Sequence, residues 1–118
     1  MGERRKFKRR YLAFYSRVFE TQSHQMLGHV VDMTPQGLML ISETPLPLDT
    51  NFSLEIELPE GFASKRAITF SARSRWSQVD LDPQFHNIGF ELVKIEPEDV
   101  GVVQNIVDTF GFRDNVLT

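Results

Sequence analysis

The sequence predicts a mainly β domain, a barrel or a sandwich of short strands, that ends in one α-helix. Three observations predict this fold class. Apolar and polar side chains alternate with a period of two in several short segments, as they do on a half-buried strand. Turn-forming residues separate these segments at the spacing of an all-β domain. Near residue 97 the apolar period lengthens to about 3.6, which indicates a helix.

The N-terminal half contains three predicted strands. Residues 11–20 fit a first strand whose side chains alternate between two faces. Met26–Val31 and Leu38–Ser42 are short, mostly apolar runs that predict the second and third strands. The segment 32–37, Asp-Met-Thr-Pro-Gln-Gly, lies between them, and its composition is typical of a turn.

Three further strands are predicted after residue 50. The clearest alternation of apolar with polar side chains runs from residue 52 to residue 58. In the segment 66–78, one face carries Ile68, Phe70, Ala72, Ser74 and Trp76. In the segment 87–95, one face carries Ile88, Phe90 and Leu92. We expect both faces to point into the core.

The predicted helix spans residues 97–110. Pro97 suits the first helical position, and the carboxylates of Glu98 and Asp99 favour the positive end of the helix dipole. Apolar side chains then recur at helical spacing at Val100, Val103, Ile106, Val107 and Phe110. Gly111 is a natural stop. This apolar stripe must cover one end or one face of the β domain.

Length and composition fit one domain of 118 residues, with a basic arm over residues 1–10 and a folded domain over residues 11–118. The chain contains no cysteine, which excludes a disulfide scaffold and a cysteine nucleophile and suits a cytoplasmic protein. No apolar run approaches the roughly 18 residues of a membrane-spanning helix, so we expect no membrane insertion.

Charge is distributed unevenly along the chain. Six of the first ten residues are Lys or Arg, against one Glu. The remaining 108 residues carry seven basic and fifteen acidic side chains, a net charge of −8. A basic segment attached to an acidic body predicts a localised anionic partner. An extended DNA or RNA surface would need basic side chains spread over the body, so we expect no nucleic-acid partner.

Two motifs contain residues that can bind an anionic or guanine-containing ligand. In the first, Arg5 and Arg9 are four residues apart, a spacing that puts both side chains on the same side of a strand or of a helix. Each guanidinium can bind guanine O6 and N7, or two phosphate oxygens, with two parallel hydrogen bonds. Taken alone, this segment is equally typical of a solvated basic tail.

The second motif is the segment 32–37. The Asp32 carboxylate can accept hydrogen bonds from N1–H and the exocyclic amine of guanine, and the Thr34 hydroxyl can add a contact. Gly37 can adopt the positive φ that lets the backbone turn closely under a ligand. Taken alone, the same residues make an ordinary turn.

Together the two motifs resemble those of the PilZ domain family, whose signature is RxxxR followed by [D/N]xSxxG. Arg5-x-x-x-Arg9 precedes the first predicted strand, and Asp32-x-Thr34-x-x-Gly37 follows the second. The resemblance continues through the apolar strand after Gly37, the segment Asn-Ile-Gly-Phe at 87–90 and the closing helix. It therefore covers nearly the whole chain.

The resemblance implies a β-barrel of about six antiparallel strands that binds the bacterial second messenger cyclic di-GMP (c-di-GMP) and is not an enzyme. Arg5 and Arg9 would clamp the nucleotide from a flexible N-terminal arm that is mobile when empty and wraps over the ligand when bound. Asp32, Thr34 and Gly37 would form the barrel side of the pocket. Ordering of the arm would then signal in trans to a separate, unidentified protein partner. Motility and biofilm regulation are the family's usual processes.

Two details extend the expected ligand site. Thr34 replaces the usual serine, which keeps the hydroxyl but adds a methyl group and stiffens the side chain. Arg4, directly before the RxxxR core, accompanies a stacked ligand dimer in this family, so we expect two cyclic di-GMP per protomer. Secondary contacts are assigned to Arg10, Arg73, Arg75 and Trp76. The more ordinary role of Trp76 is packing in the core or at the barrel rim.

Two alternatives remain open at this point. The first is a degenerate PilZ-like module that no longer binds nucleotide and acts purely in protein interactions. The second is a small barrel that binds single-stranded nucleic acid through the arm and aromatic side chains. The three histidines show no metal-ligand spacing, and no nucleophile elbow or Walker loop is present. We therefore expect no metal, no cofactor and no catalytic residue.

Overall fold

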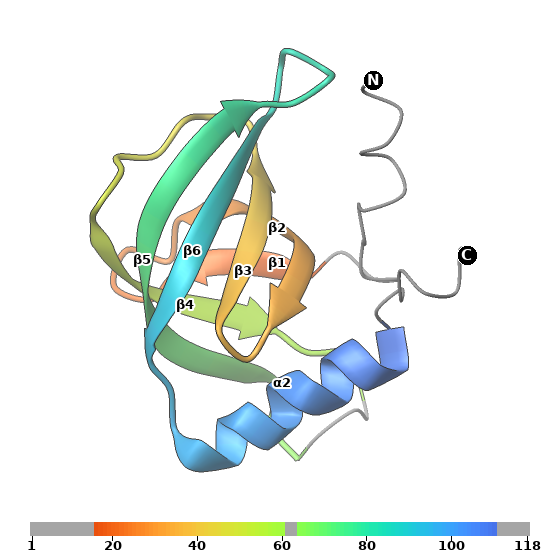
Figure 1. Ribbon diagram of the computed structural model, residues 1–118. Helices are drawn as coiled ribbons and strands as arrows, with labels where there is room; N and C mark the ends of the chain where they lie inside the picture. Colours follow the sequence, from red (N-terminus) through yellow and green to blue (C-terminus); the bar gives the residue numbers. More distant parts are fainter. Residues whose placement is uncertain (1–15, 61–63, 111–118) are drawn as a thin grey trace.

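The computed structural model describes residues 16–60 and 64–110 and contains six strands and one helix in this part of the chain (Figure 1). They are β1 (Arg17–Glu20), β2 (Met26–Thr34), β3 (Gly37–Ser42), β4 (Asn51–Glu57), β5 (Ala67–Val79), β6 (His86–Lys94) and α2 (Pro97–Phe110). All neighbouring strands pair antiparallel in the order β1-β2-β3-β6-β5-β4, and β4 pairs with β1 to close the barrel. The predicted fold class, a barrel of six antiparallel strands with a C-terminal helix, is confirmed.

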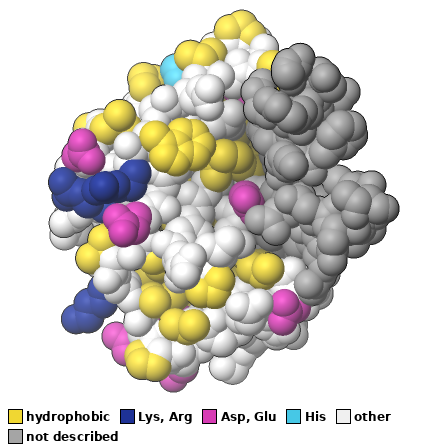
Figure 2. Space-filling model, in the orientation of Figure 1, with side chains coloured by type: hydrophobic (Ala, Val, Ile, Leu, Met, Phe, Trp, Pro, Cys, Tyr) yellow, Lys and Arg dark blue, Asp and Glu magenta, His cyan; other side chains and the backbone are white. Residues whose placement is uncertain are grey.

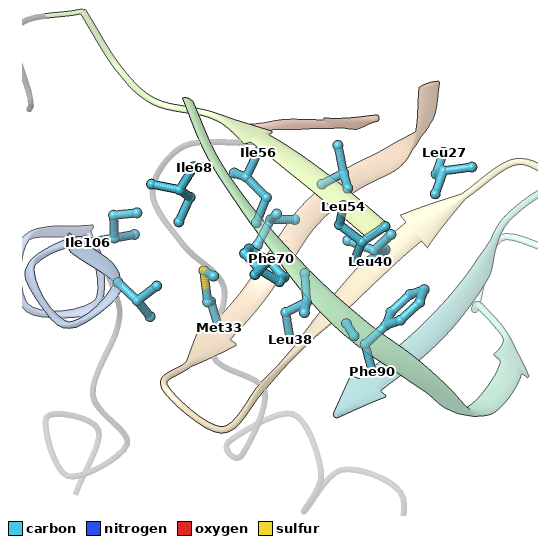
Figure 3. Close-up of a cluster of buried hydrophobic side chains, with 14 of the residues drawn as sticks. Leu27, Met33, Leu38, Leu40, Leu54, Ile56, Ile68, Phe70, Phe90 and Ile106 are labelled. Carbon is cyan, nitrogen blue, oxygen red and sulfur yellow. The ribbon is translucent and has the colours of Figure 1, made fainter. Parts of the chain in front are cut away.

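The barrel interior is one apolar cluster to which every strand contributes (Figure 3). In β4 the predicted alternation holds, because Leu54 and Ile56 are fully buried while Glu55 and Glu57 lie on the outer face. At one end of the interior the Phe52 ring meets the Phe90 ring edge to face, with centroids 5.7 Å apart. Closure of the sheet lets each strand bury its inward face.

Helix α2 covers the end of the barrel at which β2 ends (Figure 1). Val103 and Ile106 are fully buried and join the core, and Ile106 lies on the side of Met33 and Ile68 (Figure 3). The predicted helix and its role as a cover are confirmed. Near its first turn the Asp99 carboxylate is buried, and Lys65 Nζ lies 2.7 Å from its Oδ1. The expected stop at Gly111 lies outside the described residues.

Two strand boundaries differ from the prediction. Of the strand predicted over 11–20, the described part is β1, which begins at Arg17, and residues 11–15 lie outside the described residues. Strand β2 continues past Val31 to Thr34, so the segment 32–37 is not one long turn. Its ladder with β3 runs to the pair Thr34↔Gly37, which leaves a two-residue turn.

Trp76 does not share the face of Ile68, Phe70, Ala72 and Ser74 on which it was predicted. Ile68, Phe70, Ala72 and Ser74 of β5 are buried as expected, but Trp76 is 44% exposed. The ladder with β6 shifts between Ser74 and Trp76, because Arg75 is an extra residue that forms a β-bulge. The bulge moves the indole from the core-facing side to the outer face, where it pairs with Gly89.

Within the ranges 16–60 and 64–110, no helix has the length and apolar character needed to cross a membrane.

Candidate ligand-binding site

The hairpin between β2 and β3 holds the second motif in a fixed shape. The Asp32 Oδ1 atom accepts a hydrogen bond from the Met33 N–H at 2.9 Å, and the Thr34 Oγ1 atom accepts one from the Gln36 N–H at 3.1 Å. The Gln36 carbonyl accepts a bond from the Leu92 N–H at 2.9 Å, which ties the turn to β6. The motif is therefore part of the barrel wall.

A β-bulge in β2 decides which way Asp32 points. Val30 pairs with Leu40, and Asp32 pairs with Met39, so Val31 is the extra residue. In a regular strand Asp32, two residues after Val30, would share the core face of Val30. The bulge instead places the carboxylate beside Met39 on the outer face, where it is half-buried.

Gly37 is needed for a different reason from the predicted one. Positive φ among the described glycines occurs at Gly28 and not at Gly37. A Cβ at Gly37 would instead collide with the carbonyl oxygen of Phe90 in β6. The glycine therefore allows the backbones of β3 and β6 to approach closely behind the motif.

Gly89 and Trp76 form the opposite wall. A Cβ at Gly89 would collide with the indole ring at Cε2 and Nε1, so Trp76 lies against the bare backbone of β6. The indole remains partly exposed and presents its other side to solvent. An exposed aromatic surface held in this way can stack on a planar ligand.

These walls enclose a pocket of about 350 Å³ on the outer face of β2, β3, β6 and β5. Figure 2 shows hydrophobic side chains gathered near the middle of this face, with charged groups around them. The pocket is lined by Asp32, Met33, Thr34, Gln36, Gly37, Leu38, Met39, Arg75, Trp76, Gly89 and Phe90. Its size is at the lower end of the range of small-molecule sites, about 300–1,000 Å³.

Arg75 supplies a cation at the pocket wall. Its guanidinium lies 3.8 Å from an Asp49 carboxylate oxygen and 3.7 Å from one of Glu91, and all three side chains are at least half exposed. Ion pairs this long and this exposed hold a side chain weakly. Arg75 is therefore able to exchange them for a phosphate group.

The structure brings together five of the residues predicted for the site, namely Asp32, Thr34, Gly37, Arg75 and Trp76. Arg73 does not line this pocket; its Nη1 donates to Asn51 Oδ1 at 3.2 Å on the β4 side of β5. Arg4, Arg5, Arg9 and Arg10 lie outside the described residues.

Six lining residues were not predicted as site residues, namely Met33, Gln36, Leu38, Met39, Gly89 and Phe90. The signal for Gly89 was present, since a glycine inside an apolar strand indicates a close approach of some group to the backbone. The identity of that group, the Trp76 indole, depends on the bulge at Arg75 and has no local sequence signature.

A larger hollow of about 950 Å³ lies at the other end of β2 and β3. Among the described residues, its lining includes none of the segment 32–37, so we place the candidate site in the smaller pocket. Among the residues that the structure describes, no group of three or more His, Cys, Asp or Glu side chains could hold a metal ion.

Comparison with known proteins gives one family. The model of the PilZ domain matches residues 3–109, which is most of the chain. No curated protein matches by sequence.

Solved structures share the fold. The Escherichia coli YcgR PilZ domain with c-di-GMP superposes with a TM-score of 0.60 at 15% identity, covering 86% of this chain and 87% of that one. YcgR from Escherichia coli in complex with c-di-GMP gives 0.64 at 14% identity and 85% coverage of this chain. The Bacillus subtilis inhibitor of motility MotI/DgrA gives 0.67 at 17% identity and 83% coverage. The chain spans 43% of that YcgR chain and 48% of the MotI chain.

Proposed function

The chain belongs to the PilZ domain family, and we propose that it is a receptor for cyclic di-GMP that signals to a separate protein partner. The proposal rests on one observation, which is that both sides of one pocket offer groups suited to a nucleotide. Asp32, Thr34 and Gly37 of the second motif line this pocket together with the exposed indole of Trp76 and the weakly paired guanidinium of Arg75. Neither binding nor signalling requires a catalytic step or a cofactor.

Each wall of the pocket offers a contact to a guanine nucleotide. The Asp32 carboxylate accepts from the N1–H and exocyclic amine of guanine, and the Thr34 hydroxyl retains a proton to donate. The Trp76 indole stacks on the base, and Arg75 pairs with a phosphate.

The described part of the chain begins near the pocket, at Ser16. The Ser16 carbonyl accepts a hydrogen bond from the Val30 N–H at 2.9 Å, so the arm leaves the barrel two residues from Asp32 along β2. Arg9 lies seven residues before Ser16, which gives it a reach of about 25 Å. Arg5 and Arg9 therefore have enough chain to close over a nucleotide held by the barrel. Closure orders the arm and changes the surface that a partner meets.

Known structures support this assignment. Both YcgR structures contain c-di-GMP, and MotI is an inhibitor of motility. This chain covers only about half of the MotI chain and of one YcgR chain. The structural similarity therefore does not identify its partner or the process that it controls, and both are proposals. We propose motility or biofilm output in trans from a cytoplasmic receptor.

The proposed stoichiometry is two nucleotides per protomer, stacked on each other. Arg4 precedes the RxxxR core and supplies a further guanidinium for the second nucleotide. A single nucleotide per chain at saturation would contradict this part of the proposal and leave the receptor function intact.

Isothermal titration with cyclic di-GMP tests the function. We expect binding at micromolar concentration or tighter, with GTP and cyclic GMP as controls that do not bind comparably. Because Trp76 is the only tryptophan, its intrinsic fluorescence gives a second readout at the pocket itself. No binding at micromolar concentrations would overturn the proposal and leave the alternative, a PilZ-like module that acts only in protein interactions.

A further inference from the structure

The C-terminal part of β5 leaves one edge of the sheet open. The ladder between β4 and β5 ends at the pair Asn51↔Arg73, and the last backbone bonds on that side join Ser74 to the loop before β4. From residue 75 to residue 79, β5 pairs with β6 on its other side, and no described strand pairs with its outer edge. Figure 1 shows β5 and β6 continuing together toward the loop that joins them. We call residues 75–79 the open edge.

The ladder with β6 shows which backbone groups of the open edge lack a strand partner. The Asp80 N–H donates to the Phe85 carbonyl at 2.9 Å. Since hydrogen-bonded and non-hydrogen-bonded pairs alternate in an antiparallel ladder, Gln78 also directs its backbone groups toward β6. Ser77 and Val79 therefore direct their N–H and C=O groups away from β6, to the open side. Each of them offers one donor and one acceptor to a further strand.

The side chains of the open edge protect it poorly. All five are exposed, and Val79 is a large apolar side chain with an exposed fraction of 58%. Soluble proteins usually protect an edge strand with lysine, proline, a bulge or a covering segment. The bulge and the charge at Arg75 protect only the start of the edge, and residues 76–79 contain no lysine or proline. The edge is therefore suited to pairing with another strand.

The charges at the two ends of the edge favour a second copy of this chain as that strand. Arg75 lies at one end, and Asp80 and Asp82 lie just past the other end. The acidic end is fixed, because Asp82 Oδ1 accepts a bond from the Gln84 N–H at 3.1 Å and Asp80 Oδ1 accepts one from the Asn87 amide at 2.9 Å. When two identical strands pair antiparallel, the cationic end of each lies beside the acidic end of the other. The open edge is thus complementary in charge to a second copy of itself.

We propose that two copies of this chain pair antiparallel along the open edge, about a two-fold axis at Gln78. In this register Ser77 of each copy lies opposite Val79 of the other, and both residues use the backbone groups that point to the open side. An axis at Ser77 would instead pair Val79 with the bulged Arg75, and an axis at Val79 would pair Ser77 with Leu81 of the turn. Only the axis at Gln78 pairs both open residues within the regular part of the strand. The contact is isologous, as in most homodimers.

This pairing would bring two candidate pockets close together. Arg75 and Trp76 begin the open edge, and both line the pocket of their own copy. Two strands this short bury less surface than the roughly 1,200 Å² of a stable interface, so we expect a weak dimer that forms at high protein concentration. The inference goes beyond the proposed function and does not depend on nucleotide binding.

Cysteine cross-linking tests the register, since the chain has no native cysteine. Gln78→Cys puts one thiol from each copy at the axis, where the Cα atoms of a non-hydrogen-bonded pair are about 4.5 Å apart and within reach of a disulfide. Ser77→Cys is the matched control, because its two exposed thiols would be diagonal neighbours, with Cα atoms about 7–8 Å apart, too far for an unstrained disulfide. Thr69→Cys, on the part of β5 that pairs with β4, measures random collision.

Under mild oxidation of the full chain without nucleotide, we expect Gln78→Cys to form its intermolecular disulfide several-fold faster than either control. A rate for Gln78→Cys equal to that of Thr69→Cys would mean random collision, and the proposal would fail. A rate equal to that of Ser77→Cys would exclude the proposed register and overturn it as well.

Removal of an outward N–H gives an independent readout. Val79→Pro deletes a donor on the open side, and proline is tolerated in an edge strand, so the circular dichroism spectrum should not change. Val79→Ala is the control, because it shortens the side chain and keeps the N–H. In sedimentation velocity at rising protein concentration, we expect the wild type and Val79→Ala to approach twice the monomer mass. Val79→Pro removes two symmetry-related hydrogen bonds, so its dimer dissociation constant should rise about tenfold or more. A wild type that stays monomeric, or a Val79→Pro variant that associates as the wild type does, would contradict the proposal.

Discussion

Arg5 and Arg9 are the side chains on which the proposed clamp depends most. Arg5→Ala and Arg9→Ala each remove charge-assisted hydrogen bonds worth about 1.5–3 kcal/mol, so the affinity for cyclic di-GMP should fall roughly tenfold to a hundredfold. Isothermal titration measures the loss. Lys8→Ala is the matched control, because it removes one charge between the two arginines and leaves both arginines in place. Wild-type affinity in both arginine variants, with an unchanged circular dichroism spectrum, would show that the clamp is assigned wrongly.

Trp76 and Gly89 are predicted to act as one unit. Gly89→Ala puts a methyl group where the indole of Trp76 lies, so the ring must move. Because Trp76 is partly exposed, the ring can move without unfolding the barrel. We expect Gly89→Ala and Trp76→Ala each to weaken nucleotide binding by about three- to thirtyfold, the equivalent of one stacked base.

The double variant separates this coupling from two independent effects. In the Trp76→Ala background, Gly89→Ala should cause little further loss, because the ring that it displaces is gone. Additive losses would instead mean that Gly89 acts through the barrel backbone.

At the scale of elements, α2 is predicted to be part of the barrel fold. Ile106 is fully buried among the core side chains, so Ile106→Ala should lower the free energy of unfolding by about 2–5 kcal/mol. Chemical denaturation measures the change. Asn105→Ala, one residue earlier on the exposed side, should be nearly neutral. A neutral Ile106→Ala would mean that the helix is an appendage that folds independently of the barrel.

The ion pair between Lys65 and Asp99 joins the loop before β5 to the first turn of α2. Its hydrogen bond to Asp99 raises the pKa of Lys65 above the ordinary 10.5. The protonated lysine is thus favoured in the folded state, and the stabilisation is present below about pH 10.5 and lost as the pH rises through the folded-state pKa.

Thermal unfolding across the alkaline range tests this linkage. The Tm of Lys65→Met should lie below that of the wild type at pH 7–9, and the difference should shrink above about pH 10.5. A difference that stays constant to the highest pH would show that Lys65 acts through packing and not through its charge.

Element types were largely predictable from the sequence, but two bulges were not. The alternation in residues 52–58 and the helical stripe after Pro97 each specify one face. The structure buries Leu54 and Ile56 of the first, and it buries Val103 and Ile106 of the second but leaves Val100 37% exposed. Val31 and Arg75 are each one extra residue in a ladder, which reverses the side-chain alternation locally. Such an insertion depends on the partner strand, so it leaves no local signal. Both bulges lie beside the candidate pocket, and they determine where Asp32 and Trp76 point.

The whole molecule combines an acidic body with a basic arm, which predicts how binding depends on salt. A cyclic dinucleotide has only two phosphates, so its affinity should fall less than about tenfold between 50 and 200 mM salt. Titration at the two salt concentrations measures this. A fall of about a thousandfold or more, together with binding to single-stranded oligonucleotides, would instead favour the nucleic-acid alternative.

At this scale the family could be predicted from two motifs, while the pocket could not. Arg5, Arg9, Asp32, Thr34 and Gly37 stand in the order of the PilZ signature, and the family match extends over residues 3–109. Strands β5 and β6 contribute Arg75, Trp76, Gly89 and Phe90 to the pocket, which are 43 to 58 positions away from Asp32 and are brought to it by the register of the ladders. The larger hollow likewise depends on strand pairing, because β3 pairs with both β2 and β6 and so brings the start of β2 near the loop between β5 and β6.

A crystal structure of this chain with cyclic di-GMP tests the account most directly. We predict one guanine within hydrogen-bonding distance of Asp32 with its face against Trp76, and Arg5 and Arg9 on the same nucleotide. A nucleotide bound away from both the motif and the arm, for example in the larger hollow at the start of β2, would contradict the account.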